Sequence, residues 1–166
     1  AQAAEQTPGA EAQPIARPKA AWEMIDPSSE VPLYKQISAL KIADRIRLAR
    51  YASRPVRRIL ARDIDKQIHV ELVKNPKIQD DEILEFSGMP AMSARALRWI
   101  SKQSRYVRRR EVTLNLILNP STPNDIATKL MGQLSHQEIY RILHSPKARE
   151  VIKRAARKRL MQAGVI

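Results

Sequence analysis

The sequence of 166 residues contains no cysteine, only four glycines and only seven aromatic side chains. The absence of cysteine excludes disulfides, thiolate metal ligands and thiol nucleophiles. Four glycines leave little material for a phosphate-binding loop, and no Walker, dinucleotide-binding or serine-elbow motif occurs. No apolar run approaches the roughly 18 residues that a membrane-spanning helix needs. We therefore predict a protein without catalytic activity, cofactor or metal site, and without a membrane span.

Positive charge dominates the composition, but it is unevenly distributed. The net charge is +13, whereas residues 1–34 carry five acidic and two basic side chains, a net charge of −3. The remaining 132 residues therefore carry 28 basic and 12 acidic side chains, a net charge of +16. Such a field attracts nucleic acid, anionic lipid headgroups or an acidic protein, and net charge alone does not distinguish among them.

Two windows of the sequence, separated by 44 positions, resemble each other. Residues 68–87 are IHVELVKNPKIQDDEILEFS, and residues 112–131 are VTLNLILNPSTPNDIATKLM. Each window holds an apolar helical pattern, an Asn-Pro pair and a second short helical pattern. Weaker copies of the break occur at Arg54-Pro55 and Ser145-Pro146, and a break without proline is expected near residues 101–106. Periods of about 20 to 50 residues are typical of stacked helical repeats.

These breaks divide the chain into about nine short helices. The residue before a proline is pushed out of the α region, so a helix normally ends there. The expected helices cover residues 39–51, 55–62, 66–74, 80–86, 93–103, 106–118, 124–133, 135–144 and 147–161. Leu72, Leu116 and Ile142 are expected to occupy equivalent buried positions before three of the prolines. The sequence thus predicts an all-α fold, a short HEAT-like α-solenoid.

Several helix ends carry their own signals. Ser38 is expected to cap the first of these helices. Ser135, with Glu138 three residues later, fits a capping box. Gly88 and Gly164 are expected to terminate the helices that precede them.

Residues 1–34, rich in Ala, Gln, Glu and Pro and without an apolar period, are predicted to form a disordered tail. Residues 35–166 would form the basic helical-repeat domain. The tail has neither the charged start nor the apolar segment of a secretory signal, so we expect a cytoplasmic protein. Its one apolar cluster consists of Trp22, Met24 and Ile25. This cluster docks on the helical body as a cap, or forms a short motif for a partner, or has no role.

The Leu-x-x-Asn-Pro turn at residues 72–76 and 116–120, each followed by a short polar helix, carries a family resemblance. It resembles the leucine-rich repeat variant, a relative of HEAT-like repeats, over roughly residues 47–159. In that family a cysteine-ligated iron–sulfur cluster can accompany the repeats, and the absence of cysteine here means that this feature is not carried over. The segment is also similar to small bacterial helical-repeat proteins, which implies a fold and no activity.

The basic residues form three blocks about 50 residues apart, within residues 45–62, 95–110 and 147–159. Stacked repeats could place these blocks along one side of the molecule, where arginine suits phosphate and carboxylate contacts. The alternative is a solvated face that keeps the protein soluble. The candidate residues for binding an anionic partner are Arg54, Arg57, Arg58, Arg98, Lys102, Arg105, Arg108, Arg109, Arg110, Lys153, Arg154 and Arg157.

Other ionisable clusters have simpler interpretations. Carboxylates at a helix start usually serve as capping and dipole groups, and we assign that role to Asp80, Asp81, Glu82 and Glu85. His136 and His144 are too far apart for a two-histidine metal motif on one helix, and His69 stands alone. We interpret all three histidines as structural.

The sequence therefore favours a non-enzymatic scaffold that binds an acidic protein partner or assembly. A nucleic-acid-associated protein that binds the DNA or RNA backbone is the alternative, although the blocks have few aromatic residues for base stacking. A third hypothesis is an enzyme built on a repeat fold, as in some DNA-base repair proteins. That enzyme would need Trp99 to face Glu85 or Asp63 in a concave pocket.

Deletion of residues 1–20 is expected to leave the helical content and the thermal midpoint nearly unchanged, because this composition cannot bury enough apolar surface to become ordered. Circular dichroism melts of the full and shortened chains measure both quantities. Protection of residues 1–20 from protease in the free protein would contradict the prediction.

Overall fold

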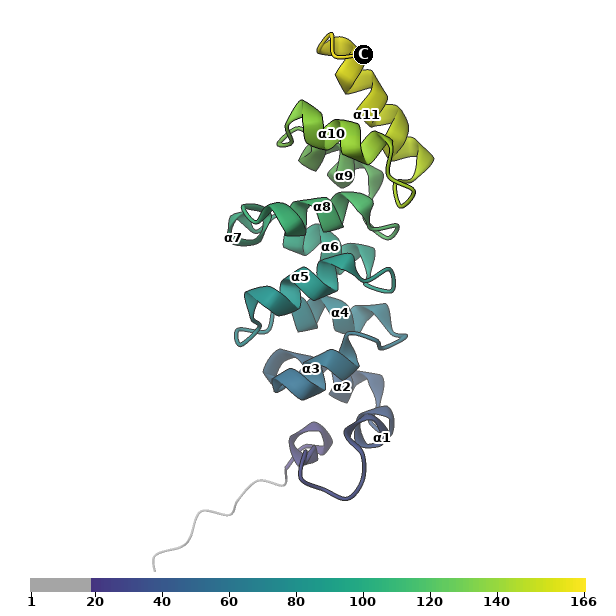
Figure 1. Cartoon of the computed structure of the whole chain (residues 1–166). Helices are drawn as coiled ribbons and strands as arrows, with labels where there is room; N and C mark the ends of the chain where they lie inside the picture. Colours follow the sequence, from purple (N-terminus) through teal and green to yellow (C-terminus); the bar gives the residue numbers. More distant parts are fainter. Residues whose placement is uncertain (1–18) are drawn as a thin grey trace, which may run out of the picture.

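The computed structural model describes residues 19–166, so most of the predicted tail, residues 1–18, lies outside the described part. Within residues 19–166 the regular elements are eleven α-helices and one 3-10 helix, without a strand. This confirms the all-α prediction. Figure 1 shows the helices stacked along one long axis, with the first elements at one end and the C-terminus at the other.

The helices are short and joined by brief turns. Near the N-terminal end lie η1 (Ala21–Met24), α1 (Leu33–Ser38), α2 (Ile42–Tyr51) and α3 (Arg54–Leu60). The middle contains α4 (Lys66–Val73), α5 (Asp80–Gly88), α6 (Ala94–Ser101), α7 (Ser104–Val107) and α8 (Arg110–Leu118). The far end contains α9 (Asn124–Met131), α10 (His136–Leu143) and α11 (Glu150–Gln162).

The stack has two layers of helices. In Figure 1, α2, α4, α6 and α9 lie in one layer, and α3, α5, α8 and α10 lie in the other. Helix α11 packs on both α9 and α10 at the C-terminal end. Successive helices of the first layer begin 24, 28 and 30 residues apart. The 44-residue similarity instead relates α4 of one layer to α8 of the other, so it marks a shared turn rather than the spacing of helices within a layer.

That shared turn occurs four times within residues 35–166. In each copy a proline occupies the second position, and the amide of the fourth residue donates to the carbonyl of the first, a β-turn. The four hydrogen bonds are Ile78 to Asn75 at 3.1 Å, Met92 to Met89 at 3.1 Å, Thr122 to Asn119 at 3.1 Å and Ala148 to Ser145 at 3.2 Å. The fourth residue is buried in every copy. The turn therefore reverses the chain and contributes a side chain to the core.

The proline turns of the structure differ from the predicted set at two positions. The turn at Met89-Pro90 belongs to this set although methionine, not asparagine, precedes the proline. Arg54-Pro55 does not belong to it, because α3 begins at Arg54 and Pro55 lies within its first turn. Proline is compatible with a first helical turn, where the backbone amide has no partner within the helix.

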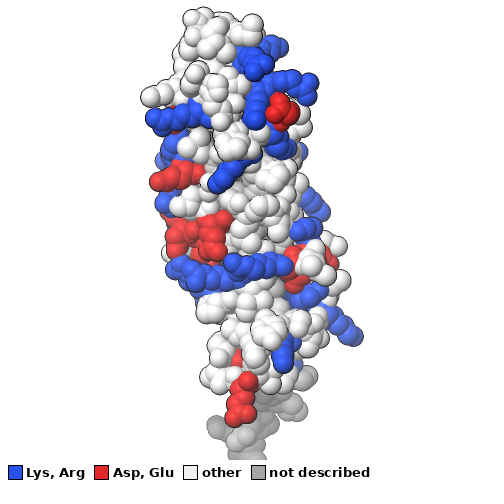
Figure 2. Space-filling view, turned by 45° about the vertical axis from the view of Figure 1, so that its right-hand side comes forward, with Lys and Arg blue, Asp and Glu red and all other residues white. Residues whose placement is uncertain are grey.

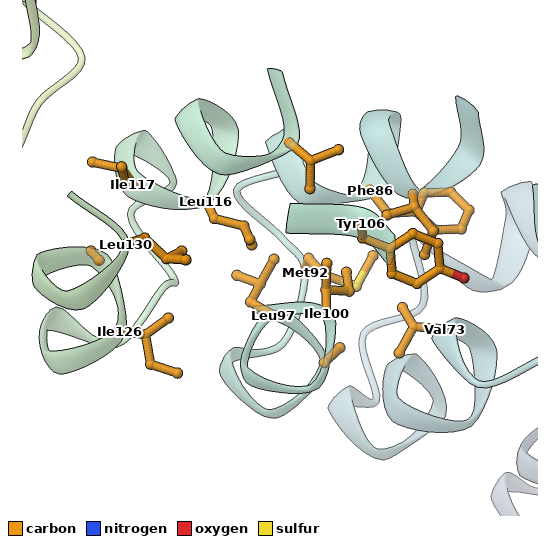
Figure 3. Close-up of a cluster of buried hydrophobic side chains, with 14 of the residues drawn as sticks. Val73, Phe86, Met92, Leu97, Ile100, Tyr106, Leu116, Ile117, Ile126 and Leu130 are labelled. Carbon is orange, nitrogen blue, oxygen red and sulfur yellow. The ribbon is translucent and has the colours of Figure 1, made fainter. Parts of the chain in front are cut away.

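The apolar core runs between the two layers, as the cluster in Figure 3 illustrates. Leu72, Leu116 and Ile142 are 0%, 0% and 2% exposed. Each lies four residues before the proline of its turn, and Phe86, fully buried, occupies the same position before Pro90. The predicted equivalence of the first three positions is confirmed.

Residues 19–166 form eleven α-helices, two more than predicted, and the additional helices are the short α1 and α7. Helix α1 lies where the tail was expected to end, and Ser38 is its last residue rather than a cap for the next helix. The hydroxyl of Ser38 donates to the carbonyl of Lys35 at 3.0 Å. Helix α7 is separate from α8 because the backbone becomes extended at Arg109, the N-cap of α8.

The two glycines assigned to helix ends behave differently. Gly164, with φ of 67°, follows α11, and its left-handed conformation confirms that it ends that helix. Gly88 has no positive φ and is the last residue of α5. A Cβ at Gly88 would lie 3.3 Å from the side-chain nitrogen of Asn115 in α8, so glycine there permits close packing of the two helices.

The segment of residues 19–34 departs from the prediction of a disordered tail. Trp22 of η1 stacks on Tyr51 of α2, with ring centroids 5.4 Å apart. The side chain of Gln36 donates to the carbonyls of Asp26 and Val31 at 2.9 and 2.6 Å. A single aromatic anchor and these hydrogen bonds place a segment whose composition alone suggested disorder. Trp22 and Ile25 of the cluster thus dock on the helical body, whereas Met24 is exposed.

Truncation of Leu116 to Ala is expected to lower the free energy of unfolding by about 2–5 kcal/mol, because it leaves a cavity in the core. The matched control is Ile64→Ala, since Ile64 is 90% exposed. Its effect should lie within about 0.5 kcal/mol. Urea denaturation followed by circular dichroism measures both, and equal midpoints for Leu116→Ala and wild type would contradict the core assignment.

Candidate interaction surface

Buried polar contacts join neighbouring helices within each layer, between α2 and α8. The side-chain amide of Asn75 donates to the carbonyls of Ala49 and Ala52, at the end of α2, at 2.8 and 3.3 Å. Asn119 does the same at the end of α5, donating to Ser87 and Met89 at 2.8 and 2.9 Å. The carbonyls of Ala49 and Ser87 lie in the last turns of α2 and α5, where the helix itself supplies no donor, and asparagine supplies one. The two Asn-Pro turns therefore link α2 to α4 and α5 to α8.

A buried ion pair links α3 to α5. Arg57 and Glu82 are 3% and 0% exposed, and the guanidinium donates to both carboxylate oxygens at 2.9 and 2.6 Å. Arg57 also donates to the carbonyl of Ala52 at 2.9 Å, and Glu82 accepts from the amide of Gln79 at 3.0 Å. Burial alone would raise the pKa of Glu82, but the hydrogen bonds from Arg57 and Gln79 outweigh it and hold that pKa below the usual value.

A histidine links α4 to α6. His69 is fully buried, and its Nδ1 accepts the backbone amide of Ser93, the N-cap of α6, at 3.0 Å. Burial, together with the nearby charge of Lys66, lowers the pKa of His69. The imidazole is consequently neutral and acts as a hydrogen-bond acceptor at the start of α6, which agrees with the structural role predicted for it.

The next two pairs of neighbouring helices, α6 with α9 and α8 with α10, have no such buried polar link among the described residues. Polar contacts nearer the surface join them: Arg98 pairs with Asp125 at 3.3 Å, and Arg110 pairs with Glu138 and donates to the carbonyl of Gln133, both at 3.0 Å. A groove lies along each pair. We call these the α6–α9 groove, of about 450 Å³, and the α8–α10 groove, of about 370 Å³. Ser145 lines the α8–α10 groove at the turn position that asparagine holds in two of the other copies, and its short side chain makes no link to another helix.

The structure divides the twelve candidate binding residues into two groups. Seven form ion pairs within the protein: Arg54, Arg57, Arg58, Arg98, Arg105, Arg110 and Lys153. Five have no ion pair with a described residue: Lys102, Arg108, Arg109, Arg154 and Arg157. The prediction that Arg57 binds a partner is wrong, because its guanidinium is buried and paired with Glu82, so it stabilises the fold and does not reach a partner. The binding role of the others stays a prediction.

Pairing also differs between the two halves of the stack. Residues 35–93 carry 12 basic and eight acidic side chains, a net charge of +4, whereas residues 94–166 carry 16 basic and four acidic, a net charge of +12. Twelve of those 16 basic side chains make no ion pair with a described residue. In Figure 2, acidic side chains lie beside basic ones at mid-height of the visible face, and basic side chains outnumber acidic ones toward its upper, C-terminal end.

The acidic run at the start of α5 does more than cap a helix. Glu82 completes a capping box with Gln79, as the position predicted. The other three carboxylates form ion pairs with arginines of α3 and α7, which the sequence did not indicate. These pairs are Asp80 with Arg105 at 2.7 Å, Asp81 with Arg54, and Glu85 with Arg58 at 4.0 Å. Spacings of 25 to 27 residues between Arg and acid, close to one step within a layer, are the signal that could have revealed them.

Trp99, Glu85 and Asp63, which the enzyme hypothesis would bring together, each contact other residues. Glu85 pairs with Arg58, and Asp63 pairs with Arg45 at 3.4 Å. Trp99 packs against Tyr106, with ring centroids 6.3 Å apart. No cluster of three or more metal-ligating side chains is found in residues 19–166, and no helix there is long and apolar enough to cross a membrane.

Comparison of the chain with protein-family models, with curated proteins and with solved structures finds no match. The resemblance to the leucine-rich repeat variant therefore stays a prediction from the Asn-Pro turns.

Replacement of Glu82 by Gln is expected to lower the free energy of unfolding by about 3–5 kcal/mol at neutral pH, because it leaves the buried charge of Arg57 uncompensated. The matched control is Asp81→Asn, which removes an exposed partner of Arg54 and should have a much smaller effect. Denaturant titrations at pH 7 measure both changes.

The same pair generates a pH dependence. Since the pKa of Glu82 is lower in the folded state, its stabilising contribution is complete above the unfolded value of about 4.3. It is lost as the pH falls through the folded value. The stability difference between wild type and Glu82→Gln should therefore shrink as the pH falls below about 4, and a difference that stays constant there would contradict the assignment.

Proposed function

We propose that the protein is a non-enzymatic scaffold of the HEAT-like α-solenoid type, whose C-terminal half binds an acidic protein partner. The observation that carries the proposal is the excess of unpaired basic side chains in residues 94–166, where 16 basic residues accompany four acidic ones. In residues 35–93 the acidic side chains neutralise much of the positive charge within the protein. An acidic surface would therefore be attracted chiefly to α6–α11.

Two features favour a protein partner over nucleic acid. Among the aromatic side chains of α6–α11, Tyr106 is buried, Trp99 packs against it, and the exposed Tyr140 packs against His144. Base stacking on exposed aromatic residues, which single-strand binding proteins use, therefore has little support here. An elongated stack of helices instead offers an extended surface of the kind that repeat proteins use for protein contacts.

The proposal is tested by fluorescence anisotropy with two labelled probes, a 20-residue polyglutamate peptide and a 20-base-pair DNA duplex, near 150 mM salt. The peptide should bind with an affinity that falls as the salt concentration rises. Duplex DNA should bind no more tightly than the non-specific range, with a Kd of about 10⁻⁴–10⁻⁶ M. The variant Arg154→Glu/Arg157→Glu should weaken peptide binding by at least about threefold, because it reverses two exposed charges of α11.

The matched control reverses two exposed lysines of the N-terminal half, Lys74→Glu/Lys77→Glu, with the same change in net charge. It should weaken peptide binding less than the α11 variant does. Sub-micromolar binding of the duplex would show that nucleic acid, and not an acidic protein, is the partner. Absence of peptide binding by the wild type would contradict the proposed function.

A further inference from the structure

The α6–α9 groove lies where the layered packing of the helices is interrupted. Helices α2, α4 and α6 pack directly on one another, whereas α9 packs mainly on α8 and α11. The short helix α7 is inserted after α6, and residues of both α6 and α7 line the groove. With this additional helix in the connection, a space of about 450 Å³ lies between α6, α7 and α9.

Three basic side chains surround this space. Arg98 and Lys102 come from α6 and its end, and Lys129 comes from α9. Lys102 and Lys129 are exposed and have no ion pair or side-chain hydrogen bond with a described residue. Arg98 contacts Asp125 at 3.3 Å, and the side chains of that pair are 45% and 67% exposed. The groove therefore contains one weakly engaged cation and two that are available to a ligand.

The remaining lining determines which anion fits. Val107, Ile126 and Leu130 contribute apolar surface to the groove, and Ser104 and Gln133 contribute polar groups. No aromatic side chain is among the lining residues, so a nucleobase would find no ring to stack on. A glutamate or aspartate side chain combines aliphatic carbons, which suit the apolar surface, with a carboxylate, which suits lysine and arginine.

We propose that the α6–α9 groove binds an acidic peptide segment of a partner protein. Carboxylates of the segment contact Lys102 and Lys129, and its aliphatic carbons lie on Val107, Ile126 and Leu130. Another carboxylate of the segment competes with Asp125 for Arg98, because an exposed ion pair is weak and readily exchanged. This inference rests on the proposed function and assigns it to one site.

The test uses anisotropy of a fluorescein-labelled 12-residue polyglutamate peptide and the full chain near 150 mM salt. Lys102→Glu/Lys129→Glu should weaken binding by at least about tenfold, because it reverses both available cations. The charge-matched control, Lys74→Glu/Lys77→Glu, should change affinity by less than about threefold. Thermal melts establish that both variants remain folded.

A second variant keeps the inference testable independently of any loss of folding. Asp125→Asn removes the carboxylate that competes for Arg98, so it should tighten peptide binding by about two- to fivefold. Its control is Glu111→Gln, which makes the same change in net charge at an exposed acid outside the groove and should have a smaller effect.

The outcomes distinguish the groove from the wider proposal. If Lys102→Glu/Lys129→Glu binds the peptide as tightly as wild type, or if the control loses as much affinity as this variant, the groove is not the binding site. The proposed function would be unaffected. Absence of wild-type binding would overturn both. Tighter binding of a labelled 12-nucleotide oligothymidine than of the peptide would overturn the assignment of the ligand as an acidic peptide.

Discussion

The stacking of these helices depends on partners for polar groups that lose water when one helix covers the end of another. Asn75 and Asn119 supply amide donors to carbonyls at the ends of α2 and α5, and the buried pair Arg57–Glu82 joins α3 to α5. An unsatisfied buried carbonyl or an uncompensated buried charge costs more than a made hydrogen bond contributes. These contacts therefore select one arrangement of neighbouring helices, which apolar packing alone would leave less well defined.

The same contacts distinguish two parts of the stack. Where buried polar links are present, from α2 to α8, the acidic side chains are largely committed to arginines within the protein. Where the links are absent, at α6–α9 and α8–α10, most basic side chains lack acidic partners among the described residues. Grooves of similar volume lie there, between α4 and α6, and beside α1–α3. The part of the molecule with fewer buried polar links is thus the part with more unpaired basic side chains.

The sequence predicted the local features of the fold better than their arrangement in space. The Asn-Pro breaks, the burial of Leu72 and Leu116 and the capping role of Glu82 all follow from local chemistry, and the structure agrees. The separation of α7 from α8 was missed, because nothing in the composition of residues 104–110 distinguishes one helix from two. The structural role of Arg57 was also missed, since a buried arginine differs from an exposed one only through a partner 25 residues away.

The sequence predicted the positive charge of the candidate surface but not which basic residues form it. Composition indicated an anionic partner, whereas the distinction between engaged residues such as Arg54 and available ones such as Lys102 requires the ion pairs. The most direct test is a ¹⁵N–¹H correlation spectrum recorded while an acidic peptide is added to the labelled protein. If the peptide binds the α6–α9 groove, the shifts should be concentrated on the amides of α6, α7 and α9. Shifts spread evenly over the stack, or confined to α2–α5, would contradict it.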